Sequence, residues 1–365
     1  MGKLKPIEHK FKALFFGALK SFLSKRSDGT NRLLDAAQMK KVLVFRPDRI
    51  GDMVITLPLV DGLKRHFPLI KVSILASPKN VSLIQDDSRF EKIFLYKKHL
   101  LSSPVELKKI RREKYDCIID TVFEDSVTTL FLSHFCAAGK PIIGMGKNRF
   151  AMYYDFNCDN SGGQIVDNTL KLLGAFGIDS TKVSGYSELH LGRQAIEIAE
   201  DFSKTLTSNL KIGLNLSSGA PTRVWQREKW MELTKCILSA LPESQIILIT
   251  IPSERNLAQE IKVQFKDRVH IIPHNLDIAG VSAIIKGLDV LITPDTSLVH
   301  IARAFLVAVV GMYTGNVKNF DLWHPYGMKT SVARAVHDDN IFDLKVEQVF
   351  DVLESVIGSK QVVKR

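Results

Sequence analysis

The sequence predicts an α/β protein of two facing Rossmann-like domains, each built on a doubly wound parallel sheet. Short apolar runs of strand length alternate with helical segments in both halves of the chain. With 365 residues, of which 45% are hydrophobic, the chain can bury one core in each of two domains. Turn-forming and small polar residues at 177–187 mark the connection between them. We therefore expect an extension at 1–38, an N-terminal domain at 39–184, a C-terminal domain at 185–342, and a closing helix with a tail at 343–365.

The composition narrows the class of partner. Lys and Arg exceed Asp and Glu, and the formal charge of +11 favours an anionic partner such as a phosphorylated substrate, an anionic lipid or a nucleic acid. The sequence has no zinc-finger spacing, aromatic ribonucleoprotein motif or helix-turn-helix pattern, so nucleic acid is disfavoured. The scattered cysteines form no CxxC pair, which predicts no metal site and no disulfide framework and fits the reducing cytoplasm. No apolar run reaches the roughly 18 residues of a membrane span.

The extension carries a predicted amphipathic helix within residues 5–26. Its apolar and aromatic positions follow helical spacing, namely Phe11, Leu14, Phe15, Ala18, Leu19, Phe22 and Leu23. Lysine and arginine residues flank this stripe, as in helices that lie on an anionic membrane surface. A secretory signal is disfavoured, because Lys20 interrupts the apolar centre and no small-residue cleavage site follows. Two interpretations remain: peripheral contact with the inner face of the cytoplasmic membrane, or packing on the protein's own body or a second subunit.

The first strand, loop and helix organise the N-terminal half. An apolar run at 42–45 predicts a central strand covered on both faces. An amphipathic helix that Asp52 opens should follow and end at Pro68, with Gly51 permitting the backbone turn between strand and helix. Such a loop lies at the carboxyl edge of an open α/β sheet, where these folds bind ligands, so Arg46, Arg49 and Gly51 are candidate substrate-binding residues.

Asp52 has two interpretations at this edge. It is either a first-turn carboxylate that complements the helix dipole, or a catalytic base. Arg46 and Arg49 flank it, and their charges should keep the carboxylate ionised at neutral pH so that it can take a proton from a hydroxyl group.

Further elements follow in alternation along both halves. In the N-terminal half we expect strands at 71–76, 92–96, 115–120 and 141–144, an irregular loop near the acceptor at 146–163, and a helix at 165–176. In the C-terminal half we expect strands at 211–216, 245–251, 269–272, 290–292 and 307–313, and helices at 228–241, 254–265, 278–287 and 297–305. A closing helix should occupy 346–357.

Two loops of the C-terminal half carry candidate binding residues. After strand 211–216, the hydroxyl groups and open backbone of Ser217, Ser218 and Gly219 precede the fixed positive charge of Arg223, which suits a diphosphate. The alternative is a polar loop whose Trp225 and Trp230 pack on the domain. Glu254, which opens the next helix, is a further candidate for substrate binding.

The second loop follows strand 290–292. Asp295, Thr296 and Ser297 can cap the next helix and expose its amide groups to an anion. His300 should lie about one turn inside that helix, where it is either a binding residue or an ordinary structural histidine.

Four segments in this order resemble the ADP-heptose:lipopolysaccharide heptosyltransferase family. They are RPDRIGDMVITLPLVDGLKRHFP, the SSG...R.W...KW segment, PDTSLVHIARA and NFDLWHPYG. The resemblance extends from Lys41 to about Val349, and the order and spacing of the segments are more specific than any one motif. It implies a glycosyltransferase-B architecture with a central cleft and inverting sugar transfer. The C-terminal domain would bind an ADP-linked sugar, and the N-terminal domain would bind the lipopolysaccharide core or a related glycan. Neither a cofactor nor an obligatory metal is implied.

Carried over by position, the resemblance makes Asp52 the family's acid after the glycine and Arg223 its cationic phosphate contact. Ser217 and Ser218 match its hydroxyl-bearing loop, while Asp295, Thr296 and His300 match its donor-binding segment. The chain departs from the family in three places: Arg223 where Lys is common, Ser297 where Gly is frequent, and TGNVKN in place of a Gly-Pro-Thr-like loop. These departures concern the donor sugar and not the reaction class.

The expected reaction is direct displacement at the anomeric carbon. Asp52 would deprotonate the acceptor, while Arg223, Ser218 and the helix amino terminus at Thr296 would stabilise the departing diphosphate. A sugar-nucleotide epimerase of the same fold and a non-catalytic, membrane-associated sugar-nucleotide-binding protein remain as alternatives. A nicotinamide dehydrogenase is disfavoured, since neither half carries GxGxxG with a ribose-binding acid at the expected distance.

Overall fold

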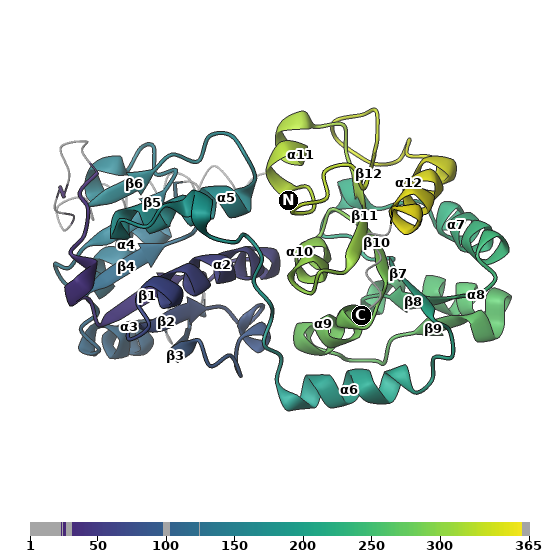
Figure 1. Ribbon diagram of the computed structural model, residues 1–365, viewed down its shortest axis with the longest axis horizontal. Helices are drawn as coiled ribbons and strands as arrows, with labels where there is room; N and C mark the ends of the chain where they lie inside the picture. Colours follow the sequence, from purple (N-terminus) through teal and green to yellow (C-terminus); the bar gives the residue numbers. More distant parts are fainter. Residues whose placement is uncertain (1–22, 24, 27–30, 98–102, 124, 360–365) are drawn as a thin grey trace, which may run out of the picture.

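The computed structural model describes residues 23, 25–26, 31–97, 103–123 and 125–359, which form two domains, each around a parallel sheet (Figure 1). In the described chain each sheet has six strands, in the order β3-β2-β1-β4-β5-β6 and β12-β11-β10-β7-β8-β9. The N-terminal strands are β1 Lys41–Phe45, β2 Lys71–Ala76, β3 Phe90–Leu95, β4 Cys117–Asp120, β5 Ile142–Met145 and β6 Phe156–Cys158. The C-terminal strands are β7 Leu210–Asn215, β8 Ser244–Ile249, β9 Val269–Ile271, β10 Val290–Pro294, β11 Ala308–Tyr313 and β12 Val332–Arg334. The predicted fold class is confirmed.

Helices cover both faces of each sheet. The N-terminal helices are α2 Ile50–His66, α3 Ser103–Arg112, α4 Val127–Ala137 and α5 Ile165–Leu170. The C-terminal helices are α6 Arg193–Ser203, α7 Arg227–Ala240, α8 Arg255–Phe265, α9 Ile278–Lys286, α10 Ser297–Ala304, α11 Val317–Trp323 and α12 Val346–Gly358. The closing helix α12 packs on α7 and β11 of the C-terminal domain. No helix in the described ranges is long and apolar enough to cross a membrane.

Several elements of the structure were not predicted from the sequence. The stretch at 146–163, expected to be an irregular loop, contains β6, which pairs with β5 in parallel and completes the sheet edge. A strand of three residues gives too short a period for the sequence pattern to show. The helices α6 and α11 and the strand β12 were also not predicted, and the expected helix at 165–176 is α-helical only to Leu170 before a 3₁₀ turn, Lys171–Phe176.

Strand β1 shows why the sheet is buried on both sides. It pairs in parallel with β2 and β4, with Val42 opposite Val72 and Cys117. Because side chains alternate along a strand, Val42 and Val44 enter one hydrophobic cluster while Leu43 and Phe45 enter another on the opposite face. The continuous apolar run predicted this burial correctly.

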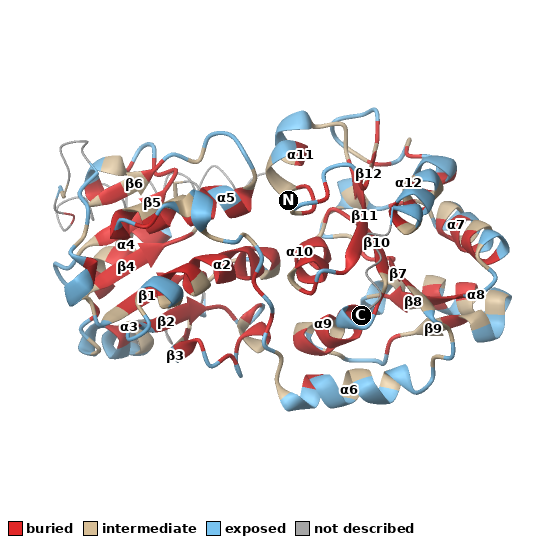
Figure 2. Cartoon of the chain, viewed as in Figure 1, coloured by how far each residue is buried: buried red, intermediate tan, exposed pale blue. Residues whose placement is uncertain are grey.

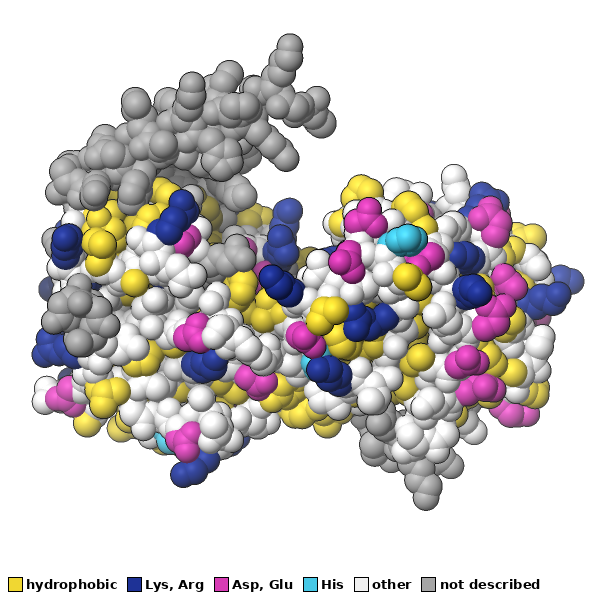
Figure 3. All heavy atoms as spheres, turned by 90° about the horizontal axis from the view of Figure 1, so that it is seen from above, with side chains coloured by type: hydrophobic (Ala, Val, Ile, Leu, Met, Phe, Trp, Pro, Cys, Tyr) yellow, Lys and Arg dark blue, Asp and Glu magenta, His cyan; other side chains and the backbone are white. Residues whose placement is uncertain are grey.

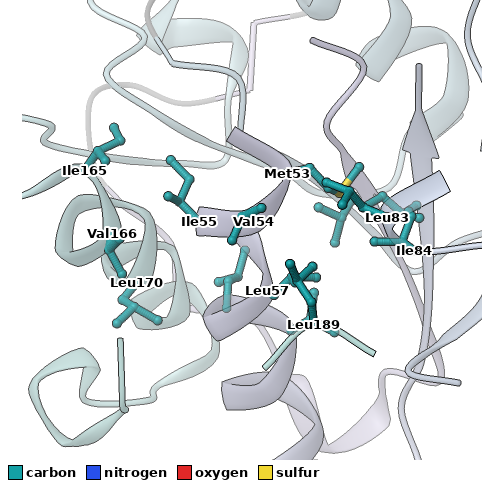
Figure 4. Close-up of a cluster of buried hydrophobic side chains, with 14 of the residues drawn as sticks. Met53, Val54, Ile55, Leu57, Leu83, Ile84, Ile165, Val166, Leu170 and Leu189 are labelled. Atoms are coloured by element: carbon teal, nitrogen blue, oxygen red, sulfur yellow. The ribbon is translucent and has the colours of Figure 1, made fainter. Parts of the chain in front are cut away.

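Helix α2 is buried on almost every side rather than amphipathic as expected. It lies between its own sheet and the C-terminal domain, and Figure 2 shows both α2 and α10 buried where the domains meet. Figure 4 shows Val54 and Ile55 on the side of α2 that faces Val166 of α5. The same hydrophobic cluster continues into α10 through Leu298, so one core crosses the domain junction. A helix packed on opposite sides has no need of a polar face.

The described end of the N-terminal extension packs on the N-terminal domain. Leu23 is buried in the cluster beneath α4, and the Arg26 guanidinium donates to the carbonyl oxygen of Lys140 at 2.8 Å and to Asp155 Oδ2 at 3.1 Å. The predicted amphipathic helix otherwise lies outside the described residues.

Candidate active site at the domain junction

Two strand, loop and helix units, one from each domain, meet at the candidate site. The first turn of α2 lies directly against the first turn of α10. A Cβ atom on Gly51 would lie 2.9 Å from Cδ2 of His300 and 3.4 Å from Cα of Ser297. Gly51 has no positive φ and is already helical, so the expected reason for this glycine, a backbone turn, was wrong. It is required because another side chain would hold the two helices apart.

Asp52 lies in this first turn of α2 and is only 6% exposed. Burial raises the pKa of its carboxyl group to about 6, and nearby Asp48 adds to the rise, although Arg46 and Arg49 oppose it. Among the described residues the nearest cation is Nη1 of Arg46, 3.9 Å from Oδ1, which is too long for a strong hydrogen bond. About nine-tenths of the carboxylate is therefore ionised at pH 7, with a pKa close to the value that suits a general base.

Arg46 is part of the scaffold beneath Asp52. It is 1% exposed, and its guanidinium donates to Oγ1 of Thr56 at 2.9 Å, to Oδ2 of Asp48 at 3.1 Å and to the carbonyl oxygen of Thr121. These contacts tie the loop after β1 to α2 and to the end of β4. Arg46 was predicted to bind substrate, and its burial instead suits a residue that orients the loop and adjusts the charge beside Asp52.

The loop after β7 is held by Asn215, which ends the strand and was not predicted as a site residue. Its Nδ2 atom donates to Oγ1 of Thr293 at 2.9 Å and of Thr296 at 3.3 Å, and its Oδ1 atom accepts from the amide of Ser217 at 3.1 Å. Asn215 thereby fixes the hydroxyl-bearing loop against the N-cap of α10, where Thr296 accepts from the amide of Leu298 at 3.3 Å. Asn215 could have been recognised as a site residue from the sequence, because it is a polar side chain at the carboxyl end of a buried strand.

The serines of this loop differ in availability. Ser217 is buried, and its Oγ atom accepts from the amide of Ile251 at 2.9 Å, which braces the neighbouring loop. Ser218 is half-buried and donates to the carbonyl oxygen of Ala220 at 3.0 Å. No atom lies within 4 Å of a Cβ placed on exposed Gly219, so the backbone there is open to a ligand.

Arg223 and Asp295, predicted from separate loops, form an ion pair. Nη2 of Arg223 lies 2.9 Å from Oδ2 of Asp295, and Nη1 donates to the Asp295 carbonyl oxygen at 2.6 Å. Asn319 of α11, which was not predicted, donates to the same carboxylate at 3.1 Å. Burial raises the pKa of Asp295, while Arg223, Asn319 and Arg49 lower it. Asp295 therefore positions Arg223 and partly offsets its charge.

His300 packs across the junction. It is buried in α10, and burial lowers its pKa to about 4, so the ring is neutral at physiological pH. Its ring meets that of Trp323 edge to face at 5.9 Å, and Trp323 meets Phe123 of the N-terminal domain at 6.4 Å. His300 also lines a cavity of about 20 Å³ between the domains, together with Tyr186 of the connection. This placement supports a packing role for His300.

The structure brings most of the predicted residues to one place. Gly51 packs against the first turn of α10 in the same turn of α2 that carries Asp52. The β7 loop lies beside the α10 loop through Asn215 and Arg223. Glu254 stands apart: it follows β8 on the same sheet edge, and its carboxylate accepts a hydrogen bond from Oγ of Ser253 at 3.3 Å. Among the described residues no group of three or more His, Cys, Asp or Glu side chains could hold a metal ion.

Comparison of the sequence with known proteins identifies the family. The sequence model for glycosyltransferase family 9 (heptosyltransferase) matches residues 106–353. A lipopolysaccharide core heptosyltransferase, OpsX, of Haemophilus influenzae is 20% identical over 284 residues, which are 75% of this chain and 79% of that protein.

Solved structures share the architecture. A glycosyl transferase family 9 structure from Veillonella parvula superposes with a TM-score of 0.74 at 16% identity, covering 92% of this chain and 99% of its own. The structure of E. coli heptosyltransferase WaaC with ADP gives a TM-score of 0.70 at 17% identity, covering 88% of this chain and 100% of its own. At such identities the structural likeness establishes the fold, and the family follows from the sequence match. The chain belongs to glycosyltransferase family 9, the heptosyltransferase family.

Proposed function

We propose that the protein is an inverting, metal-independent glycosyltransferase that moves a heptose from ADP-heptose to a lipopolysaccharide core or related glycan acceptor. The observation that carries this proposal is the buried Asp52 carboxylate, with a pKa of about 6, in the turn of α2 that faces the first turn of α10. The Haemophilus influenzae relative is named for lipopolysaccharide core heptosyl transfer, and the E. coli structure holds ADP, which supports the choice of acceptor and donor.

The proposed chemistry is a single displacement. Asp52 takes the proton of an acceptor hydroxyl, and the oxygen attacks the anomeric carbon from the face opposite the diphosphate. The bond between that carbon and the diphosphate oxygen breaks, and the electron pair leaves with the diphosphate. Attack from the opposite face inverts the anomeric configuration. A positioned base contributes about 10²- to 10⁴-fold to such a rate.

The C-terminal domain would bind the leaving group. Arg223 supplies a fixed guanidinium, Ser218 a hydroxyl group and Gly219 an open backbone. The first backbone amides of α10, which follow the N-cap residue Thr296, add further hydrogen-bond donors. Preorganised donors of this kind stabilise charge as it develops on the departing oxygen. We propose that these groups replace a divalent metal, so full activity is expected in excess EDTA, and a strict requirement for added magnesium or manganese would contradict that part of the proposal.

The donor is identified first. Purified protein is screened against ADP-, GDP-, UDP- and dTDP-sugars by thermal shift, since a ligand that binds the folded state raises the melting temperature. Incubation with the selected donor, with and without a core oligosaccharide, should then show nucleotide release that depends on the acceptor, and NMR should show inversion at the anomeric carbon. Conversion of the donor without an acceptor would indicate an epimerase, and binding without turnover would indicate a non-catalytic binding protein.

The role of Asp52 is tested by Asp52→Asn, with Asp201→Asn on the exposed face of α6 as the matched control. The amide keeps the shape of the carboxylate but cannot take the proton. We expect turnover to fall by about 10²-fold or more with donor affinity nearly unchanged, whereas the control keeps wild-type turnover. Retention of more than about a tenth of the wild-type rate by Asp52→Asn would remove the general base from the mechanism.

We further propose that the protein acts at the cytoplasmic face of the membrane through its N-terminal extension. The support is the amphipathic pattern and basic flanks of residues 5–26, which suit an anionic surface. The burial of Leu23 limits the segment available for this contact to the residues that precede it.

A further inference from the structure

Arg49 holds an unusual place at the domain junction. It is the residue immediately before α2, it is exposed, and it lies two residues from Gly51, whose backbone touches α10. Its own backbone is braced by Asn80, a fully buried side chain whose Nδ2 atom donates to the carbonyl oxygens of Arg46 at 3.0 Å and Arg49 at 3.4 Å. The start of the Arg49 side chain is therefore set by the fold, while its guanidinium can reach into the junction.

Two neighbouring arginines, Arg46 and Arg223, already face carboxylates. Arg46 is buried beside Asp48, and Arg223 is paired with Asp295 at 2.9 Å. For Arg49, the described part of the chain provides no ion pair or side-chain hydrogen bond. Burial raises the pKa of both Asp52 and Asp295, and the positive charge of Arg49 opposes the rise at both carboxyl groups. Figure 3 shows Lys and Arg side chains along the junction on one face of the molecule.

We infer that Arg49 reaches across the junction to the diphosphate of the donor and supplies more of the net positive charge there than Arg223 does. This inference rests on the proposed function, because it assigns a second contact to the same leaving group. A diphosphate is attracted to net charge, and the charge of Arg223 is partly cancelled by Asp295. Loss of Arg223 would also leave the buried Asp295 carboxylate without its close cation. The affinity of Asp295 for a proton would then rise, which reduces the net change in charge at the site.

The inference has a structural consequence. The nucleotide would lie against the loops of β7 and β10 in the C-terminal domain, whereas Arg49 belongs to the N-terminal domain. A diphosphate held from both sides bridges the two domains beside Asp52. Arg49 would then link the occupation of the donor site to the position of the base.

The test compares nucleotide affinities by isothermal titration calorimetry. The proteins are wild type, Arg49→Gln, Arg49→Lys, Arg223→Gln, and Arg65→Gln as the control, since Arg65 is an exposed cation in the last turn of the same helix. The ligands are ADP, AMP and adenosine. We expect Arg49→Gln to weaken ADP about tenfold or more, the usual size of a hydrogen bond to a charged group, and to leave adenosine within about twofold. Arg223→Gln should weaken ADP less, and Arg65→Gln should match wild type.

Two further readouts separate charge from structure. Arg49→Lys should recover part of the ADP affinity, and Arg49→Gln should reduce the dependence of ADP affinity on salt. A purely structural role would weaken adenosine and ADP alike and would lower the melting temperature.

The outcomes distinguish this inference from the proposed function. If wild type binds ADP and Arg49→Gln binds it equally well, or less impaired than Arg223→Gln, the inference fails and the proposed function stands. If wild type binds neither ADP nor any other nucleoside diphosphate of the donor screen, the proposed function fails and the inference with it.

Discussion

The loops that follow β1 and β10 have the same construction, yet they use their carboxylates differently. Each loop connects a buried strand to a helix whose first turn faces the junction. An aspartate accompanies each loop: Asp52 lies in the first turn of α2, and Asp295 lies in the loop before α10. Burial raises the pKa of both. Asp295 is held by Arg223 at 2.9 Å and by Asn319 at 3.1 Å. Asp52 has its nearest cation at 3.9 Å, from Arg46.

This difference separates a carboxylate that holds its neighbours from one that can accept a proton. A carboxylate that accepts two close charge-assisted hydrogen bonds has its lone pairs engaged and serves as a clamp. A buried carboxylate with a distant counter-charge stays basic and keeps its oxygens available. Similar local structure therefore does not imply similar chemistry, and the neighbouring loops decide which role each aspartate takes.

Replacing each aspartate in turn by asparagine tests whether the two carboxylates have different roles, and it should give the largest effect. At saturating donor, Asp52→Asn should lower kcat by about 10²- to 10⁴-fold, because the base is lost. Asp295→Asn should mainly raise KM for the donor, because it releases Arg223, and should keep kcat within about tenfold of wild type. Steady-state kinetics on both variants checks this, and an equal loss of kcat would mean that the two loops are not functionally distinct.

The contact that joins the loops is the next target. Gly51→Ala places a Cβ atom 2.9 Å from the His300 ring, so α2 and α10 must separate slightly. Overpacking of this kind costs about 1–3 kcal/mol, and a shift of the base relative to the donor of about 1 Å can cost on the order of 10²-fold in rate.

Thermal melting and kcat are measured together for Gly51→Ala. Gly358→Ala at the end of α12 is the control, since no atom lies within 4 Å of a Cβ there. Wild-type kcat in Gly51→Ala would show that the approach of the helices does not position Asp52.

The raised pKa of Asp52 predicts opposite effects of Asp52→Asn on activity and stability. The folded state binds this proton more tightly than the unfolded state, for which the pKa is near 3.8. The free energy of unfolding therefore falls as pH rises from about 4 through about 6, because the buried carboxyl group loses its proton. Asp52→Asn should therefore be more stable than wild type at pH 7.5, by at most about 3 kcal/mol, and the difference should shrink toward pH 4.

Denaturant unfolding at several pH values measures this difference. In the wild type, kcat/KM should also fall below about pH 6 as the base is protonated. A variant that is less stable than wild type at pH 7.5 would show that the carboxylate is held by favourable contacts, as Asp295 is.

The smallest effect on either loop is expected from removing residues 1–22. This truncation retains Leu23 and Arg26, which pack on the N-terminal domain away from the junction. The shortened protein should stay folded, lose salt-sensitive sedimentation with anionic vesicles, and use a soluble acceptor fragment at a similar rate. If it aggregates while the intact protein ignores vesicles, the apolar stripe packs on the protein and the proposed membrane contact is abandoned.

The fold class and most of the strands could be predicted from the amino-acid sequence alone. Continuous apolar runs such as 42–45 read directly as buried parallel strands, because both faces of such a strand exclude water. Very short strands could not be predicted, since three residues such as Phe156–Cys158 are too few to show the alternation of apolar and polar side chains. The candidate loops were predictable for a related reason: polar residues and glycines directly after buried strands must lie at the carboxyl edge of the sheet.

The roles of the side chains in these loops depend on contacts that form only in the folded protein. The sequence placed Arg46 beside Asp52 as a substrate contact, and the fold buries it beneath the loop. Gly51 was explained by a local turn, but the reason for it is α10, which lies almost 250 residues later in the chain. The ion pair of Arg223 with Asp295 depends on two strands, β7 and β10, that are neighbours in space only. Burial, charge pairing and close approach are properties of residues brought together by folding, and local sequence does not contain them.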